Sequence, residues 1–304
     1  MQETLTAGAH AGTLVDRVNG FDVVECRTCG FKHVLPLPSE EELREVYRHE
    51  YYLREKPDYL ARVAEDAAWW REVWDDRYAV FESELPAGRR RVLDVGSGPG
   101  SFLARGLERG WQALGIEPAT RAAEQARALG LTVVDGFLTP ELARELPRFD
   151  VVHMSEVLEH VPDPRSTLAL AHALLASGGL VCVSVPNDYN PLQRALRAVR
   201  GFAPWWLAPP HHLNYFDFDA LGSLLERAGF DVLQRTTSFP MELFLMLGED
   251  YVADERTGRA CHAKRMAFEK TLSDAGLTPL RRALYAKLAE LGLGRLIVVT
   301  GRKR

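Results

Sequence analysis

Three alternate glycines follow a short apolar segment with an acidic residue near its end, a spacing suited to holding a ligand against the backbone. The segment covers residues 92–95, its acidic residue is Asp94, and Gly96, Gly98 and Gly100 come next. Glycine lacks a Cβ atom, so the chain can turn tightly there and lie close to a ligand. A helix that begins at such a turn points its first N–H groups at the same ligand. The residues predict a strand, a cradling loop and a helix start, although a turn that binds nothing can have this composition.

A second carboxylate follows the next apolar segment. Residues 112–116 lead into Glu117, whose side chain can accept hydrogen bonds from both hydroxyls of a ribose. A nicotinamide dinucleotide site also has an acidic residue at about this separation. However, Ser101 stands where the dinucleotide fingerprint has glycine or alanine.

These two stretches resemble motifs I and II of the class I S-adenosylmethionine-dependent methyltransferases. The resemblance rests on residues 93–100 and on Gly115-Ile116-Glu117-Pro118, and it extends over about residues 91–238. It implies S-adenosyl-L-methionine as the cofactor. The residues implied to bind it are Asp94, Gly96, Ser97, Gly98, Gly100, Glu117, Pro118, Asp135, Gly136, Phe137, Met154 and Ser155.

The resemblance also assigns parts of the cofactor to the later strand ends. Asp135 stands where the family uses an acidic side chain and a neighbouring backbone N–H to bind the adenine; a solvated turn aspartate is the alternative. Residues 149–161 resemble motif IV, which implies backbone contacts from Met154 and Ser155 to the methionine part.

The alternation of segments predicts an α/β fold, a doubly wound, mostly parallel sheet with helices on both faces. The resemblance implies seven strands. Five strands are predicted over residues 91–95, 112–117, 131–135, 150–154 and 179–185, with helices beginning near Ser101, Ala119, Pro140 and Asp163. After a helix over 219–228 and a strand over 231–237, a last strand over 295–301 is expected to pair antiparallel at the sheet edge.

Three regions are predicted along the chain. Residues 1–36 form a small N-terminal module, residues 37–86 a helical linker and lid, and residues 87–304 the methyltransferase domain. This domain carries a largely helical insertion over about 239–294, which either recognises the acceptor or a second subunit or simply packs.

The N-terminal module contains a candidate zinc site. Cys26 and Cys29 form a Cys-x-x-Cys pair at the end of a predicted strand, His33 follows, and His10 lies upstream. Two thiolates and two imidazoles form a closed tetrahedral zinc site. The alternative is a reduced cysteine pair beside two unrelated histidines. Many methyltransferases of this type begin with two such cysteine pairs, and the first pair is missing here.

The linker is predicted to hold two helices. Ser39 and Glu42 form a capping box for a helix that runs towards Tyr51 and Tyr52. A longer helix over about 58–85 carries an aromatic stripe, which favours packing over a binding surface. The stripe consists of Trp69, Trp70, Trp74, Tyr78 and Phe81.

Three residues are candidates for removing a proton from the acceptor. His160 lies in the loop after the fourth strand and could act as a base, although with Glu156 it could instead buttress this loop. The segment 202–216 is rich in aromatic residues and prolines and either builds the acceptor pocket or covers the sheet edge. Within it, the resemblance implies that His212 and Tyr215 face the pocket.

Composition limits the partners of this chain. The 304 residues have a net charge of -5, which argues against broad nucleic-acid binding through a basic surface. No apolar run reaches the length of a membrane span, the N-terminus lacks a signal-peptide pattern, and the four cysteines form no disulfide framework. We therefore expect a cytoplasmic protein.

The predicted function is transfer of the sulfonium methyl group to an oxygen, carbon or nitrogen atom of a small molecule. Family members with an N-terminal cysteine module suggest a sugar or nucleotide-sugar acceptor. The alternatives are a nicotinamide-dependent oxidoreductase on the same topology and a cofactor-binding protein without turnover.

Overall fold

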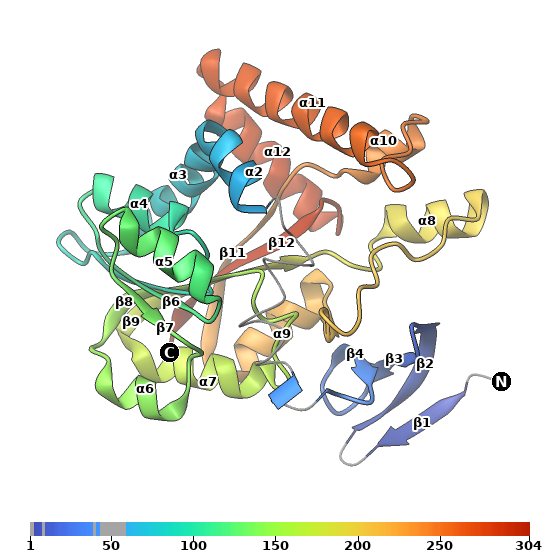
Figure 1. Cartoon of the computed structure of the whole chain (residues 1–304), viewed down its shortest axis with the longest axis horizontal. Coiled ribbons are helices and arrows are strands. Elements are labelled where there is room, and N and C mark those ends of the chain that lie inside the picture. The colour runs from blue at the N-terminus through green and yellow to red at the C-terminus, as the bar shows by residue number, and fades with distance from the viewer. Residues whose placement is uncertain (1–2, 8–9, 39–40, 43–58) are drawn as a thin grey trace. The chain divides into compact units, whose positions relative to one another are not determined.

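The computed structural model describes residues 3–7, 10–38, 41–42 and 59–304 (Figure 1). The chain divides into two compact units. Unit 1 consists of Met1–Leu37, Ser184–Leu224 and Gln234–Val299. Unit 2 consists of Pro38–Val183, Leu225–Leu233 and Thr300–Arg304.

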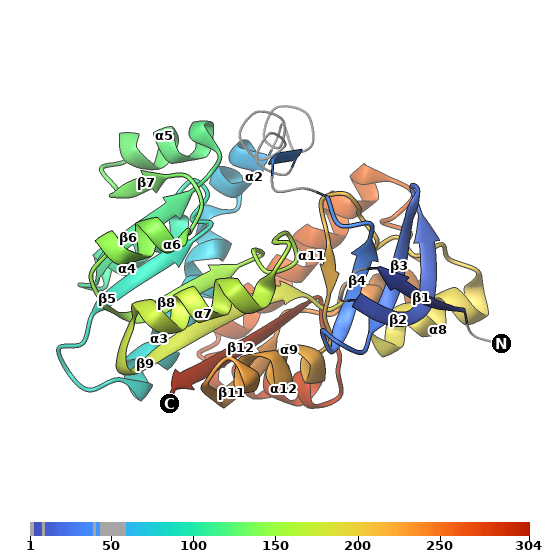
Figure 2. The same cartoon turned by 90° about the horizontal axis from the view of Figure 1, so that it is seen from below.

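The larger sheet has seven strands and confirms the predicted fold class. Its order is β11 (Phe230–Thr237), β12 (Leu296–Lys303), β9 (Leu175–Pro186), β8 (Phe149–Ser155), β5 (Arg91–Val95), β6 (Gln112–Glu117) and β7 (Val133–Asp135). Strand β5 pairs in parallel with β6 and β8, and β6 pairs in parallel with β7. Figure 2 shows these four strands side by side.

The predicted position of the last strand is wrong. Strand β12 lies between β11 and β9, so that β11 forms the edge of the sheet. The burial patterns give the reason: residues 297–301 of β12 are all buried, whereas burial and exposure alternate along β11. A continuous apolar run suits an interior strand, and an alternating one with charged residues suits an edge.

Helices follow the strands of unit 2 close to their predicted starts. They are α4 (Ser101–Glu108), α5 (Thr120–Ala128), α6 (Pro140–Glu145) and α7 (Pro164–Leu174). The single helix predicted over 58–85 is two helices, α2 (Tyr59–Glu65) and α3 (Ala67–Glu84), which are separated at Asp66. The capping box at Ser39 and the helix towards Tyr51 and Tyr52 lie outside the described residues.

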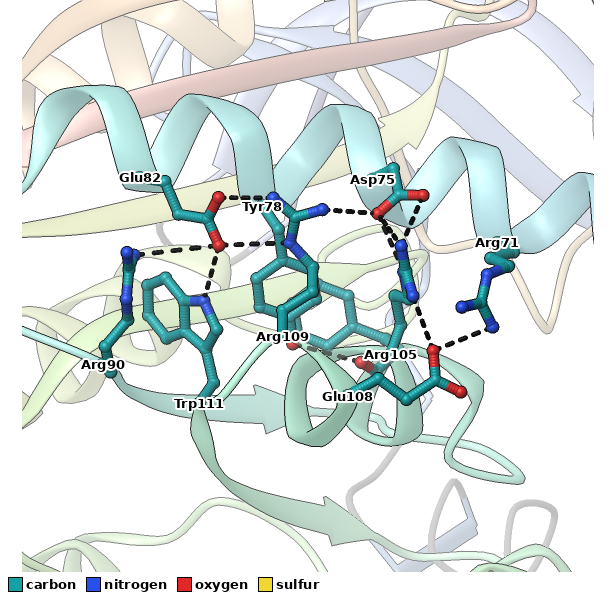
Figure 3. A network of polar contacts seen from close by, with 10 residues as sticks. Arg71, Asp75, Tyr78, Glu82, Arg90, Arg105, Glu108, Arg109 and Trp111 are labelled. Carbon is teal, nitrogen blue, oxygen red and sulfur yellow. Dashed lines mark hydrogen bonds and ion pairs between the residues drawn. The ribbon is translucent and has the colours of Figure 1, made fainter.

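Polar contacts and rings fasten α3 to α4 and to the start of β6 (Figure 3). Asp75 accepts two hydrogen bonds of 2.8 Å from Arg105, and Glu82 accepts one of 3.1 Å from the Trp111 indole. Tyr78 is fully buried, stacks on Phe102 with ring centroids 4.7 Å apart, and donates to the Phe102 carbonyl oxygen. The aromatic stripe therefore packs, as predicted, at its C-terminal end.

Unit 1 contains a smaller sheet of five strands. Its order is β1 (Thr4–Ala7), β2 (His10–Val18), β3 (Phe21–Cys26), β4 (Phe31–Leu35) and β10 (Asn214–Tyr215). Neighbouring strands are antiparallel, and in β10 Asn214 pairs with His33 of β4. The fifth strand lies in the segment 202–216, for which the sequence analysis predicted no strand.

The remaining helices include the predicted helical insertion. Helices α8 (Pro191–Arg200) and α9 (Phe218–Arg227) precede β11, and α10 (Glu242–Met246), α11 (Glu255–Asp274) and α12 (Thr278–Glu290) lie between β11 and β12. Among the described residues, no helix combines the length and the apolar composition that crossing a bilayer requires.

Replacing Tyr78 tests how strongly α3 is held. We expect Tyr78→Ala to lower the free energy of unfolding by about 3–5 kcal/mol, since it removes a buried ring and leaves a cavity. Tyr78→Phe keeps the stacking and should cost about 1 kcal/mol, the value of one hydrogen bond. Urea denaturation of both variants measures this difference, and equal losses would contradict the packing role of the ring.

Candidate functional site

A cavity of about 780 Å³ lies in unit 2 at the carboxyl ends of the parallel strands. Its wall includes the segments that follow β5, β6, β7 and β8, together with side chains of α2, α3 and α7. Ligands of open α/β sheets bind at this end of the strands. We therefore take this cavity as the candidate functional site.

The glycine loop between β5 and α4 forms one wall of the cavity. Gly96 and Ser97 both donate from their backbone N–H groups to the Ile116 carbonyl oxygen, at 2.8 and 3.1 Å. Gly100 caps α4 with a φ of 87°, a left-handed conformation that favours glycine. A Cβ atom at Gly100 would lie 2.3 Å from Leu131 Cδ1. The loop is therefore held to β6 and leaves no room for a side chain at its end.

Glu117 places a buried carboxylate at the end of β6. Glu117 is only 4% exposed. Its two carboxylate oxygens accept hydrogen bonds from the backbone N–H groups of Gly98 at 2.7 Å and Ala119 at 2.8 Å. Burial raises the pKa of this carboxyl to about 7, although both N–H donors act in the opposite direction. Each carboxylate oxygen has two lone pairs, so Glu117 can accept two further hydrogen bonds from a ligand.

A second carboxylate, Asp94, forms a buried pair with a histidine that the sequence analysis did not single out. His153 Nδ1 lies 2.7 Å from Asp94 Oδ1, and both residues are almost fully buried. The imidazole stacks on Phe102 with ring centroids 3.9 Å apart and meets the edge of Trp74. Burial raises the pKa of Asp94, and the attraction of His153 opposes this change. A polar residue inside an apolar strand was the signal that could have identified His153.

Most of the predicted cofactor residues lie together at the cavity. Those in its wall are Asp94, Gly96, Ser97, Gly98, Glu117, Pro118, Gly136, Phe137 and Ser155. Met154 is fully buried in β8, where only its backbone can serve a ligand. The Asp135 side chain is about half exposed and forms an ion pair of 2.9 Å with Arg127. This contact favours the alternative of a solvated turn aspartate.

The aromatic stripe of α3 does more than pack. Trp70 and Trp74 both belong to the cavity wall, and their rings stack with centroids 5.0 Å apart. The Trp74 indole also donates to the Ser101 hydroxyl at the start of α4. Helix α3 therefore contributes an aromatic face to the site, which the helical spacing alone did not distinguish from core.

The three candidate bases occupy different surroundings. His160 is in the cavity wall, where its Nε2 lies 3.8 Å from Glu159 Oε1. His212 and Tyr215 belong to unit 1, and the Tyr215 hydroxyl donates to the His212 carbonyl oxygen at 3.0 Å. Burial raises the pKa of Tyr215 well above the ordinary value, so its phenol stays protonated. Tyr215 thus has the surroundings of a structural strand residue, which disfavours it as a base.

The segment with many aromatic residues and prolines is largely buried within unit 1. Trp206 is 4% exposed, Leu213 is fully buried, and Tyr215 and Phe216 are each 1% exposed. The Trp206 ring packs against Tyr189 with centroids 5.3 Å apart. These contacts favour the interpretation in which much of the segment covers hydrophobic core.

A second candidate site lies on the small sheet of unit 1. One ligand atom from each of His10, Cys26, Cys29 and His33 falls within 4.8 Å of the other three. The His10 Nδ1 atom is 3.3 Å from Cys29 Sγ, and the Cys29 N–H donates to Cys26 Sγ. His33 donates from Nδ1 to the Val34 carbonyl oxygen, which leaves its Nε2 lone pair for a metal ion.

The protonation of this cluster also suits a metal ion. Burial raises the pKa of the Cys26 thiol, but hydrogen bonds from Cys29, Thr28 and Ala11 outweigh it and hold the pKa below its usual value. Burial lowers the pKa of His33, which keeps its imidazole neutral. Thiolates and neutral imidazoles are the forms that bind zinc.

The family model of the methyltransferase domain matches residues 50–235 of this chain. The chain therefore belongs to the methyltransferase domain family, and its sheet and glycine loop are those of the class I S-adenosylmethionine-dependent enzymes.

Several relatives of similar sequence carry the name ubiquinone biosynthesis O-methyltransferase. The protein from Cereibacter sphaeroides is 36% identical over 166 residues, which cover 51% of this chain and 66% of that protein. The one from Bordetella bronchiseptica is 43% identical over 108 residues, 34% of this chain and 44% of that protein. Magnesium protoporphyrin IX methyltransferase from Synechocystis, a structure with bound SAH, has a similar fold. Its TM-score is 0.51 at 14% identity, covering 88% of this chain and 100% of that one.

Alanine substitutions at two glycines with nearly the same φ can distinguish the cost of backbone strain from the cost of steric crowding. Gly110 has a φ of 81° and open space where a Cβ would be, whereas Gly100 faces Leu131. We expect Gly110→Ala to lower the free energy of unfolding by about 1–2 kcal/mol through the left-handed backbone alone. Gly100→Ala should cost about 1–3 kcal/mol more, since the methyl group must displace Leu131. Chemical denaturation measures both, and equal costs would show that the loop can move aside.

Proposed function

We propose that this chain transfers a methyl group from S-adenosyl-L-methionine to a small-molecule acceptor. Membership of the methyltransferase domain family supports the reaction class. The observation that carries the proposal is the Glu117 carboxylate, which stands buried in the cavity wall with two lone pairs still to be used. Hydroxyl groups of a ligand can donate to these remaining lone pairs, and a ribose has two such hydroxyls.

The rest of the cavity wall fits the same cofactor. The loop at 96–100 holds its backbone against the site without side chains at the glycines, so a ligand can lie close to the first turn of α4. The Ser97 hydroxyl oxygen is buried and has no hydrogen-bond partner in the described part of the chain. Gly136 and Phe137 extend the wall beyond Glu117 and can hold the adenine.

Methyl transfer from this cofactor requires the protein to do two things. The bound cofactor supplies a methyl group that its sulfonium already activates, so the protein has to align a nucleophile and exclude water. An oxygen or carbon acceptor also needs a base. His160 is our candidate because it lies in the cavity wall beside Glu159.

The acceptor class follows from two different indications. Relatives named ubiquinone biosynthesis O-methyltransferase favour a phenolic hydroxyl. The N-terminal cysteine module favours a sugar or nucleotide-sugar, as in family members with such a module. We propose a small molecule of one of these two classes as the substrate.

Two measurements test the proposed function. Calorimetry of the ligand-stripped protein should show binding of S-adenosyl-L-methionine and of S-adenosylhomocysteine, and no binding of NAD. Transfer of labelled methyl groups is then followed with a set of catechols and a set of nucleotide sugars. Binding of NAD instead of the sulfonium compound would replace our proposal by an oxidoreductase, and binding without transfer to any acceptor would favour a non-catalytic protein.

The proposed role of Glu117 predicts a pH dependence of cofactor binding. Hydroxyl donors need the ionised carboxylate, whereas below a pKa of about 7 the free protein holds this group protonated. Affinity should therefore fall as pH falls, by about tenfold from pH 8 to pH 6 for a single linked proton. Calorimetric titration of S-adenosylhomocysteine over this range measures the effect. Glu117→Gln should bind weakly at every pH and lose this slope; a slope that persists in the variant would contradict the assignment.

We further propose that His10, Cys26, Cys29 and His33 bind a structural zinc ion. The convergence of four ligand atoms and the free Nε2 of His33 support this site. Such a closed ligand set would join the start of β2 to the turn between β3 and β4.

Metal analysis tests the zinc site. We expect one zinc ion per chain in the protein as purified, and loss of this zinc in Cys26→Ser and Cys29→Ser with a lower thermal unfolding temperature, since zinc binding contributes to folding. Cys261→Ser is the matched control, because Cys261 is also a buried free thiol but lies outside the cluster. A wild-type protein without zinc after expression in zinc-supplemented medium would refute the proposal.

A further inference from the structure

We propose that the methyl acceptor is an uncharged, planar phenol that binds against the Trp70 ring of helix α3. Trp70 is then a residue that determines acceptor specificity. The inference rests on the proposed function, because it concerns the acceptor in the same cavity, and it selects the phenolic class over nucleotide sugars.

Helix α3 carries a series of rings that leads from the base of the sheet to the cavity. Tyr78 packs against Trp111, just before β6 begins, with ring centroids 5.3 Å apart. Trp74, one turn earlier in the helix, meets the edge of His153 near the carboxyl end of β8. Helix α3 therefore runs antiparallel to these strands. Trp70 lies one further turn, about 5.4 Å, towards the level at which the strands end.

Trp70 is the outermost of these stacked rings. It stacks on Trp74 with ring centroids 5.0 Å apart and an interplanar angle of 17°. Trp74 is 7% exposed, whereas Trp70 is only partly buried and belongs to the cavity wall. Val63 of the preceding helix α2 is also part of this wall. An aromatic ligand can bury one of its faces or edges against such an indole ring.

The proposed position of the cofactor leaves Trp70 to the acceptor. With the ribose at Glu117 after β6 and the adenine towards Gly136 and Phe137 after β7, the sulfonium lies on the side of β5 and β8. The acceptor has to meet the methyl group on that side. Helix α3 reaches the same side, because Trp74, on which Trp70 stacks, contacts β8.

Carboxylates line much of the remaining cavity wall. Besides Asp94 and Glu117, the wall contains Glu141, Glu156 and Asp163. The described residues of the wall include no lysine or arginine. The diphosphate of a nucleotide sugar would meet like charges here, which cost several kcal/mol when they are brought together at an interface.

The two helix N-termini at the wall carry acidic side chains of their own. Asp163 accepts hydrogen bonds from the N–H groups of Arg165 at 3.0 Å and Ser166 at 3.3 Å, and so caps α7. Glu141 stands in the first turn of α6. A helix N-terminus can bind phosphate, but here the protein's own carboxylates occupy these positions. An uncharged acceptor avoids this repulsion.

The candidate base also suits a phenol. A phenol has a pKa of about 10, whereas an aliphatic sugar hydroxyl is a much weaker acid, so an imidazole removes the phenol proton more readily. In the proposed transfer, the phenol oxygen forms its bond to the methyl carbon and its proton passes to His160. The carbon–sulfur bond breaks, its electron pair stays on sulfur, and the products are a methyl ether and S-adenosylhomocysteine.

Three probe acceptors test the substrate class with the wild-type protein. They are 4-methylcatechol, which is uncharged, 3,4-dihydroxybenzoate, which has the same ring with an anionic group, and UDP-glucose. In assays with labelled S-adenosyl-L-methionine, we expect transfer to 4-methylcatechol, at least about tenfold lower kcat/KM for the benzoate, and no transfer to UDP-glucose. Transfer to UDP-glucose, a preference for the benzoate, or transfer to none of the three overturns the inference.

Substitution of Trp70 tests its role in acceptor binding. We expect Trp70→Ala to raise the KM for 4-methylcatechol by about tenfold and to leave S-adenosylhomocysteine affinity within about twofold of wild type. Trp70→Phe keeps a ring and should restore most of the loss. Trp69→Ala is the matched control, because Trp69 contacts Trp70 edge-on but lies outside the described cavity wall. It should change neither value by more than about twofold.

The remaining outcomes distinguish this inference from the proposed function. An unchanged KM in Trp70→Ala, an equal rise in Trp69→Ala, or an equal loss of S-adenosylhomocysteine affinity would assign Trp70 to helix packing or to the cofactor, and each result overturns the inference. If Trp70→Ala does not fold, Trp70→Leu provides the same comparison with an apolar side chain that lacks a ring. A wild-type protein that does not bind S-adenosylhomocysteine would instead refute the proposed function.

Discussion

The hydrogen bonds that hold the Glu117 carboxylate are the interaction on which the candidate site depends. Its two oxygens accept N–H groups from Gly98 and Ala119, so one side chain connects the glycine loop after β5 with the segment that follows β6. Burying a carboxylate is costly unless it is well hydrogen-bonded. The same two contacts therefore organise the loop and keep a strong acceptor available to a ligand.

Helix α3 holds the glycine loop in place through its contacts with α4. Helix α3 packs against α4 through Tyr78 and Phe102, and two of its three tryptophans, Trp70 and Trp74, reach the cavity wall. Since Gly100 caps the N-terminus of α4, a helix that fixes α4 also fixes the end of the glycine loop. Helix α3, which precedes the glycine loop in the chain, is in this way part of the site.

In unit 1, the ability of the Cys-x-x-Cys motif to form a four-ligand metal site depends on the fold. Cys26 and Cys29 are close in sequence, but His10 and His33 reach them only because β2, β3 and β4 form an antiparallel sheet. Strand β10, about 180 residues further along the chain, then extends this sheet next to His33. Because it has only two residues, β10 carries too little periodicity to be predicted as a strand.

The amino-acid sequence alone determined the fold class, the glycine loop and Glu117, because each depends on local patterns: apolar runs of strand length, residues without Cβ atoms, and an acid at a strand end. Only the tertiary structure decided that β12 is an interior strand, that Asp135 pairs with Arg127, and that His153 meets Asp94. Strand order and buried polar pairs join residues far apart in the chain, and spacing along a single sequence carries no information about which of them meet.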